Sequence, residues 1–123
     1  IIMDMDNFKR INNLLGYEVG NKVLKRFAQL LRNLTIDRSI SVSRFGSDEF
    51  AIILPGVSKD QAFSIAGKIH KAVEDPTFIA PNSGVHVSVS FGISSLRDDS
   101  SSKNDLIDNA LHALSLDKAR VIR

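Results

Sequence analysis

Apolar and polar positions follow two different periods along the chain, and these periods predict both helices and strands. Apolar residues three or four positions apart are typical of one helix face, and this spacing occupies four segments: 8–15, 21–34, 62–73 and 102–119. Short apolar or alternating runs predict strands at 1–3, 40–45, 48–54 and 85–91. The pattern therefore predicts helices and strands that are interleaved along the chain.

Several residues mark where the elements begin and end. Gly16 suits the C-terminal cap of the first helix, and the second helix is expected to begin near Asn21. Residues 58–61 have the pattern of a capping box, and Pro76 ends the helix that this box opens. We expect the strand at 85–91 to pair with 78–80 across a turn.

The order of these elements predicts an α+β fold. The order is a strand, two helices, a hairpin, a helix, further strands and a last helix. This order favours an antiparallel-rich central sheet flanked by helices. A chain of 123 residues that is 43% hydrophobic and 24% charged has the size and composition of one globular domain. Because both ends are apolar and strand-like, we expect 1–123 to be a single domain cut at both ends from a longer multidomain protein.

The run Arg-Phe-Gly-Ser-Asp-Glu-Phe at 44–50 carries the clearest candidate chemistry. Its Gly46-Ser47 pair between two strand-like runs predicts a two-residue hairpin turn, in which Gly46 takes a positive φ. Asp48 and Glu49 follow at once, and two adjacent carboxylates repel each other unless a positive charge lies nearby. This arrangement predicts a divalent cation.

A second acidic segment follows the first predicted strand. Asp4 lies where the apolar start runs into Asp-Met-Asp-Asn-Phe-Lys, so it could meet Asp48 across the sheet. Mg²⁺ is typically bound by one or two carboxylates, with substrate phosphates completing its shell. Two such ions side by side are a common device for attack on a phosphate.

Four segments in order resemble the GGDEF domain family, the diguanylate cyclases: 4–12, 16–21, 44–50 and 87–93. The resemblance covers nearly the whole chain. It implies a core like that of the nucleotide cyclases and polymerase palm domains, which is ferredoxin-like. It also implies synthesis of cyclic di-GMP and pyrophosphate from two GTP molecules, at the interface of two such domains, by two-metal catalysis.

The resemblance assigns roles to individual residues. It makes Asp4, Asp48 and Glu49 catalytic, with Asp4, the Met5 carbonyl and Asp48 as ligands of Mg²⁺ or Mn²⁺. Glu49 would assist metal binding or activate the 3′-hydroxyl. The residues that would contact GTP are Phe8, Lys9, Asn12, Asn21, Gly46 and Ser47.

The sequence also departs from the family pattern. Asn21 stands where the family has a guanine-reading Asp, and Ser115 aligns with the lysine that holds the triphosphate. Lys118 or Arg120 could take over that contact. The Arg-x-x-Asp of product inhibition corresponds to Asp37 and Ile40, so that site is expected to be absent.

Two alternatives therefore stay open. The domain could be a degenerate module that binds GTP or relays a signal, for example beside a cyclic di-GMP phosphodiesterase domain. An RNA-binding sheet would need exposed aromatics for base stacking, whereas Phe45, Phe50 and Phe91 have the pattern of core residues. We expect no nucleic-acid partner.

Composition narrows the setting. The chain has no cysteine, a net charge of +2, no long apolar run and no signal-peptide pattern. These features predict a cytoplasmic domain without a membrane segment. The resemblance further implies a second GGDEF domain as partner, with an upstream sensory or downstream phosphodiesterase domain.

Overall fold

The computed structural model describes residues 1–34, 40–44, 46–75, 78 and 86–121. Its strands are β1 (Ile2–Met5), β2 (Ser41–Arg44), β3 (Glu49–Ile53) and β4 (Val89–Gly92). Its helices are α1 (Phe8–Leu15), α2 (Tyr17–Leu34), α3 (Lys59–Glu74) and α4 (Lys103–Val121). The described strands form one sheet in the order β2-β3-β1-β4, and every pair in it is antiparallel. This arrangement confirms the predicted α+β class.

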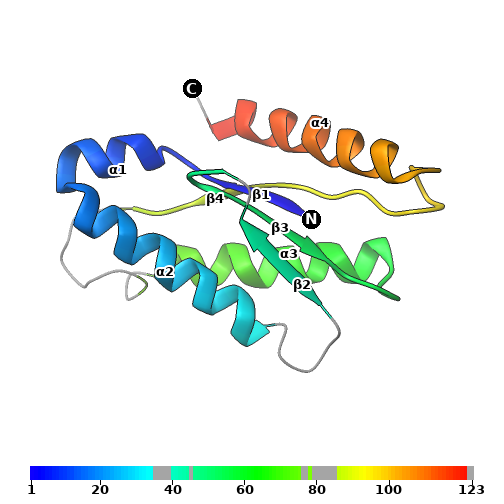
Figure 1. Ribbon diagram of the computed structural model, residues 1–123, viewed down its shortest axis with the longest axis horizontal. Helices are drawn as coiled ribbons and strands as arrows, with labels where there is room; N and C mark the ends of the chain where they lie inside the picture. Colours follow the sequence, from blue (N-terminus) through cyan, green and yellow to red (C-terminus); the bar gives the residue numbers. More distant parts are fainter. Residues whose placement is uncertain (35–39, 45, 76–77, 79–85, 122–123) are drawn as a thin grey trace.

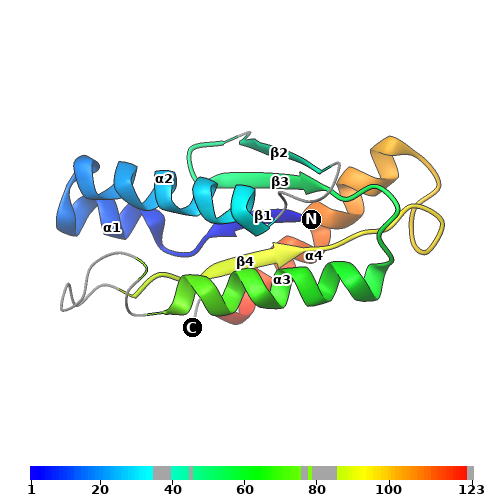
Figure 2. The ribbon, with the colours of Figure 1, turned by 90° about the horizontal axis from the view of Figure 1, so that it is seen from below.

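Helices cover both faces of the sheet (Figures 1 and 2). On one face, α2 and α3 pack over Met3, Met5, Phe50 and Ile52 and form the main core. The rings of Phe27 on α2 and Phe50 on β3 meet edge to face, with centroids 5.0 Å apart. On the other face, α4 packs on Ile2 and forms a smaller apolar cluster. Residues of β1 therefore point alternately towards α2 and α3 or towards α4.

The predicted start of the second helix is wrong. This helix begins at Tyr17, directly after Gly16, whose φ of 89° breaks the chain direction between α1 and α2. Gly20 therefore lies inside α2, where a Cβ atom would come within 1.8 Å of Asn12 Oδ1. Gly20 was expected to precede this helix, but it lies within it and serves the close approach of two helices.

The predicted two-residue turn at Gly46-Ser47 is also wrong. The strands end at Arg44 and begin again at Glu49, and Gly46 does not have a left-handed φ. Arg44 closes this longer loop, because its Nε donates to Gly46 O at 3.1 Å and its Nη2 to Ser47 O at 2.5 Å. Gly46 instead lies close to the Glu49 side chain: a Cβ atom at Gly46 would lie 2.5 Å from Glu49 Oε1, so Glu49 would have to move.

Predictions for the second half of the chain hold in part. The capping box at 58–61 forms both of its hydrogen bonds, and α4 has almost the predicted bounds. The strand at 85–91 shortens to Val89–Gly92, while Phe78 lies outside any strand and 79–85 are outside the described residues. Ile107 and Leu111 belong to the apolar face that the spacing predicts for the helix at 102–119, and we expected this face to point inward; they are 44% and 40% exposed.

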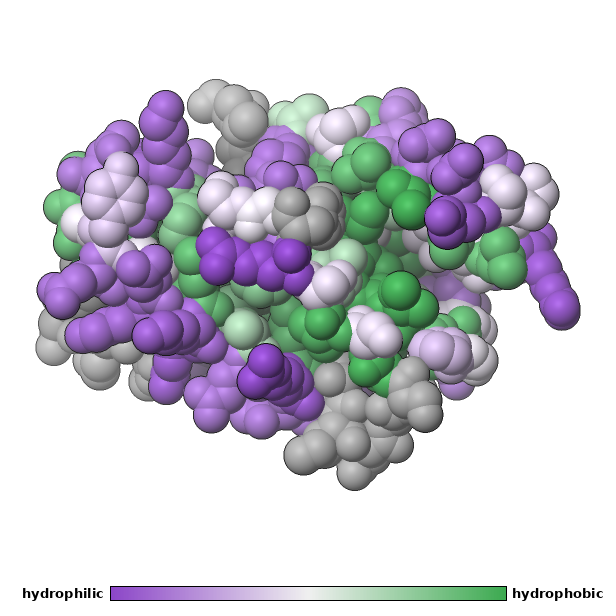
Figure 3. Space-filling model, in the orientation of Figure 1, coloured by the Kyte–Doolittle hydropathy of each residue, from purple (hydrophilic) through white to green (hydrophobic). Residues whose placement is uncertain are grey.

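The exposed side chain of Ile107 borders an apolar hollow. A cavity of about 810 Å³ lies between the end of β3, the start of α3 and the first half of α4. Ile53, Leu96 and Ile107 line it, and each is exposed. Figure 3 shows this hydrophobic surface as a hollow below α4.

Candidate active site

The antiparallel register brings the predicted carboxylates to one end of the central strands. Asp4 lies directly opposite Glu49 on β3 and opposite Ser90 on β4. Side chains of directly opposed residues project to the same face of a sheet, with Cβ atoms about 5 Å apart. Asp4 and Glu49 therefore share the face that α4 covers.

The signature loop is attached to the end of β1 by its backbone. Met5 N donates to Asp48 O at 3.1 Å, so Asp48 lies beside the carboxylate of Asp4. Ser47 Oγ donates to Asp48 Oδ1 at 3.1 Å, which orients this second carboxylate. The structure thus brings the carboxylates of Asp4 and Asp48 together, and the sheet register places Glu49 opposite Asp4, although these residues come from two distant segments of the chain.

Asp4 is the residue of this group whose charged form is least favourable in the folded protein. The pKa of its carboxyl is raised from 3.8 to about 6, chiefly by burial; the neighbouring Asp48 also raises it, and Lys118 lowers it. Lys118 Nζ lies 3.0 Å from Asp4 Oδ2, while Asp4 Oδ1 is buried and has no hydrogen-bond partner. A buried carboxylate oxygen without a donor is costly, so this atom is suited to receive a cation.

These residues fit a magnesium-type ion. Within the described ranges, no group of three or more His, Asp or Glu is placed to hold a metal. Two carboxylates suffice for Mg²⁺ when water and substrate phosphates supply the other ligands. The unsatisfied Asp4 Oδ1 and the adjacent Asp48 offer such a pair.

The turn from β1 into α1 is held by a buried carboxylate that the sequence did not single out. Asp6 is 5% exposed, and it accepts hydrogen bonds from Ser88 Oγ at 2.7 Å and Ser90 Oγ at 2.5 Å. Ser90 is fully buried, although it is a polar position in the alternating run at 85–91. Its hydroxyl can be buried because it donates a hydrogen bond to Asp6. The acidic-apolar-acidic pattern at 4–6 and the serines at 88 and 90 were the available signal.

The start of α1 lies immediately beyond Asp6. Asn7 is left-handed with φ 55°, its side chain makes no capping hydrogen bond, and the first turn contains no acidic residue. Such a helix end presents backbone N–H groups that favour anions. Phe8 is buried and Lys9 is exposed at this end.

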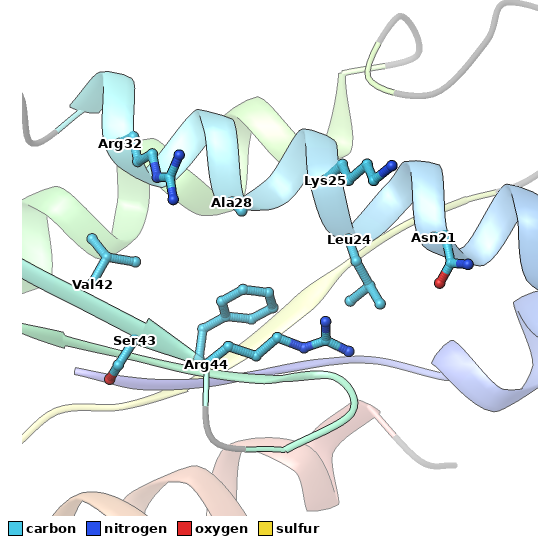
Figure 4. A pocket seen from close by; sticks show the side chains of 9 residues that line it. Asn21, Leu24, Lys25, Ala28, Arg32, Val42, Ser43 and Arg44 are labelled. Atoms are coloured by element: carbon cyan, nitrogen blue, oxygen red, sulfur yellow. The ribbon is translucent and has the colours of Figure 1, made fainter.

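The two predicted guanine contacts lie on the helical hairpin of α1 and α2. Asn12 is half-buried against Gly20, and Asn21 is exposed. Asn21 borders a pocket of about 250 Å³ between α2 and the β2–β3 hairpin, on the face opposite α4 (Figure 4). The lining residues of this pocket are Asn21, Leu24, Lys25, Ala28, Arg32, Val42, Ser43, Arg44 and Phe50.

At the other side of the site, α4 contributes Lys118 rather than Ser115. Ser115 is exposed, and its hydroxyl donates to His112 O at 2.8 Å within the same helix. Lys118 reaches Asp4 instead. The ion pair was not predicted, because the spacing within a helix does not show which strand residue it crosses.

The antiparallel sheet of this domain carries carboxylates at one end of its central strands and has helices on both faces. The family model for the GGDEF domain of diguanylate cyclases matches residues 1–121. The chain belongs to this family, which confirms the resemblance seen in its motifs.

Individual relatives agree with the family assignment. Diguanylate cyclase A of Treponema denticola is 30% identical over 114 residues, which are 93% of this chain and 30% of that protein. An uncharacterized membrane protein of Staphylococcus aureus is 35% identical over 100 residues, 80% of this chain and 28% of its own length. The chain thus spans less than a third of these two relatives.

Solved structures show the same fold. The active GGEEF domain of a diguanylate cyclase from Vibrio cholerae superposes with a TM-score of 0.87 at 28% identity, covering 97% of this chain and 74% of that one. The GGDEF domain of YfiN from Pseudomonas aeruginosa gives the same TM-score and coverage at 31% identity. As for membrane association, no described helix is both long and apolar enough to span a bilayer.

Proposed function

We propose that this domain is a diguanylate cyclase, which condenses two GTP molecules to cyclic di-GMP and releases pyrophosphate. The observation that carries the proposal is the convergence of Asp4, Asp48 and Glu49 at one sheet end, in a chain that belongs to the GGDEF family. A fold needs no such group of repelling charges for its stability. The unfavourable burial of the Asp4 carboxylate supports a functional role for this residue.

The proposed chemistry divides between the residues present. Asp4, Asp48 and the Met5 carbonyl would hold Mg²⁺ or Mn²⁺, which supplies charge neutralisation at the phosphates and a lower pKa for the attacking hydroxyl. Glu49, which lies opposite Asp4 in the sheet, would accept the proton of the 3′-hydroxyl. The uncapped start of α1, with Phe8 and Lys9, would bind phosphate oxygens.

Substrate recognition would extend to the helical hairpin. Asn12 and Asn21 would contact the guanine base, and Gly46 and Ser47 would line the nucleotide beside the acidic group. Asn21 offers one carbonyl oxygen, where a carboxylate would accept two hydrogen bonds from guanine. We therefore propose weaker base discrimination than an aspartate gives, by about 1–3 kcal/mol.

Each domain would hold one GTP, so that two domains must face each other for both attacks. A symmetric homodimer is the simplest assembly that does this. The proposed setting is a larger cytoplasmic signalling protein, in which sensory or phosphodiesterase domains control how the two copies meet.

The direct test is product formation. We would incubate the protein with GTP and Mg²⁺, separate the nucleotides by chromatography, and run Asp48→Ala and Glu49→Ala alongside. We expect cyclic di-GMP from the parent and a loss of at least about a hundredfold in both variants, as for removal of a catalytic acid or base. Asp108→Ala, an exposed carboxylate on α4, serves as the matched control and should retain full activity.

The second candidate is a GTP-binding regulatory domain, which Asn21 and Ser115 favour because both weaken the substrate contacts of the family pattern. The parent protein could be folded and dimeric and bind GTP in calorimetry, yet form no product. That result would favour the regulatory function over the cyclase. Absence of GTP binding would exclude both.

A further inference from the structure

The register of α4 places Lys118 over the acidic group. Ala110, Leu114 and Lys118 are four residues apart and so lie along one helix face. Ala110 and Leu114 pack on Ile2, and Ile2 and Asp4 project from the same face of β1 because they are two residues apart. The third member of the helix stripe therefore reaches Asp4, with Nζ 3.0 Å from Oδ2.

Two further contacts fix this register. At Gly92 of β4, a Cβ atom would lie 1.8 Å from Ala110 O and 2.6 Å from Leu114 N, so the helix backbone packs directly on the strand. Asp117 Oδ2 accepts a hydrogen bond from Phe91 N at 2.9 Å. The helix is therefore held on β4 from Ala110 to Asp117, the residue directly before Lys118.

The ion pair between Lys118 and Asp4 leaves part of the local negative charge unneutralised. Lys118 contacts only Oδ2 of Asp4, while Oδ1 is buried without a partner and Asp48 adds a second negative charge beside it. One ammonium therefore faces more negative charge than it neutralises. The Lys118 side chain is 31% exposed, so its head group has a path to solvent and to a ligand above the site.

We propose that Lys118 is a displaceable counter-ion, which pairs with Asp4 in the nucleotide-free domain and transfers to the phosphates of the bound nucleotide. This inference rests on the proposed function. A lysine suits the role because its ammonium is a point charge on a flexible stem. A divalent cation at Asp4 repels the ammonium, and the triphosphate of the same substrate offers it a new partner. Lys118 thereby takes the place of the phosphate-binding lysine that position 115 lacks.

The proposal predicts effects of opposite sign on two ligands. In Lys118→Met, which keeps most of the stem and loses the charge, Mn²⁺ alone should bind on the order of tenfold more tightly, because its competitor is gone. GTP in the presence of Mg²⁺ should bind about ten- to a hundredfold more weakly, because a charge-assisted contact is lost. Lys118→Arg should restore both values towards the parent.

Calorimetry of the full-length protein with Mn²⁺ alone and with GTP measures both effects without any turnover. Lys103→Met removes the same charge from the first turn of α4 and should change neither affinity. If both ligands weaken together, or neither changes, in a parent that binds GTP, Lys118 is only a structural ion pair and the proposal is overturned. If the parent binds no GTP, the proposed function fails first, and the phosphate transfer fails with it.

Discussion

At the scale of single residues, the site is built from charges that the fold does not neutralise fully. Asp4 shows this most clearly, because its carboxylate is buried beside Asp48 and only one of its oxygens has a partner. A ligand that supplies positive charge would relieve this strain. Binding sites commonly carry such a cost in stability.

The strain at Asp4 has a predictable pH dependence. Its folded-state pKa of about 6 lies above the usual 3.8, so the folded protein binds a proton that the unfolded chain releases between these values. The cost of the charged form is therefore complete above about pH 6 and disappears as the pH falls towards 4. Asp4→Asn should stabilise the metal-free protein by on the order of 1–2 kcal/mol at about pH 8, and by about half as much at about pH 5.

Urea denaturation in the presence of a chelator measures this difference. Asp108→Asn, at an exposed position of the same charge type, should show no such dependence on pH. An Asp4→Asn protein that is less stable than the parent at about pH 8 would show that the Lys118 ion pair outweighs the burial cost.

The residue types of the site could be predicted from the sequence, but not their partners. The Asp48-Glu49 pair and the acidic residue after the first strand were sufficient to predict an acidic group. In the structure, however, it is Glu49 that lies opposite Asp4 in the sheet, and Asp48 lies beside it in the loop. Asp6 was overlooked because its two serine partners lie more than 80 residues away in the chain. Lys118 was seen as one of two possible substitutes, and only the packing of α4 distinguishes it.

At the scale of the elements, the helices are positioned by glycines as much as by apolar side chains. Gly92 lets α4 lie directly on β4, and Gly20 lets α2 approach Asn12 on α1. The sequence shows such residues, but their role depends on a neighbour that is distant in sequence. This is why the hydrophobic period located the helices, while the start of α2 and the inward face of α4 were predicted wrongly.

Gly92→Ala tests the packing of α4. The added methyl group would meet backbone atoms of Ala110 and Leu114, which cannot move without shifting the helix. We expect a loss of about 2–3 kcal/mol in the free energy of unfolding, as for an overpacked core. Gly67→Ala on α3, where a Cβ atom meets nothing within 4 Å, should instead stabilise by about 0.5–1 kcal/mol. Equal effects in urea denaturation would contradict the close packing at Gly92.

Gly20→Ala tests the helical hairpin in a different way. Its methyl group would collide with the end of the Asn12 side chain, which can rotate away, so the gain in helix propensity of up to about 1 kcal/mol should offset most of the strain. Stability should therefore change little, while Asn12 leaves its position. Calorimetry should show weaker GTP binding, and an unchanged affinity would remove Asn12 from the proposed base contacts.

At the scale of the whole molecule, the sheet separates the residues proposed to bind metal and phosphate from those proposed to contact the base. The acidic group and Lys118 lie on the face covered by α4, whereas the pocket beside Asn21 opens on the α2 side. A nucleotide bound to both would have to pass around the end of the central strands, where the start of α1 is found (Figure 2). One domain would then present its nucleotide at the edge of the molecule, open to a second copy.

This arrangement predicts that an inactive subunit abolishes the activity of the active subunit with which it forms a dimer. If each cyclic product needs one nucleotide-loaded domain from each subunit, adding an equal amount of Asp48→Ala protein to the parent should lower its activity to about half, because only parent–parent dimers turn over. Larger additions should lower activity in proportion to the parent fraction. The assay follows cyclic di-GMP at a concentration where sedimentation shows dimers, with Asp108→Ala protein as the matched addition that causes no loss. Activity that is indifferent to the Asp48→Ala protein would mean that each domain completes the reaction alone, and it would rule out the shared site.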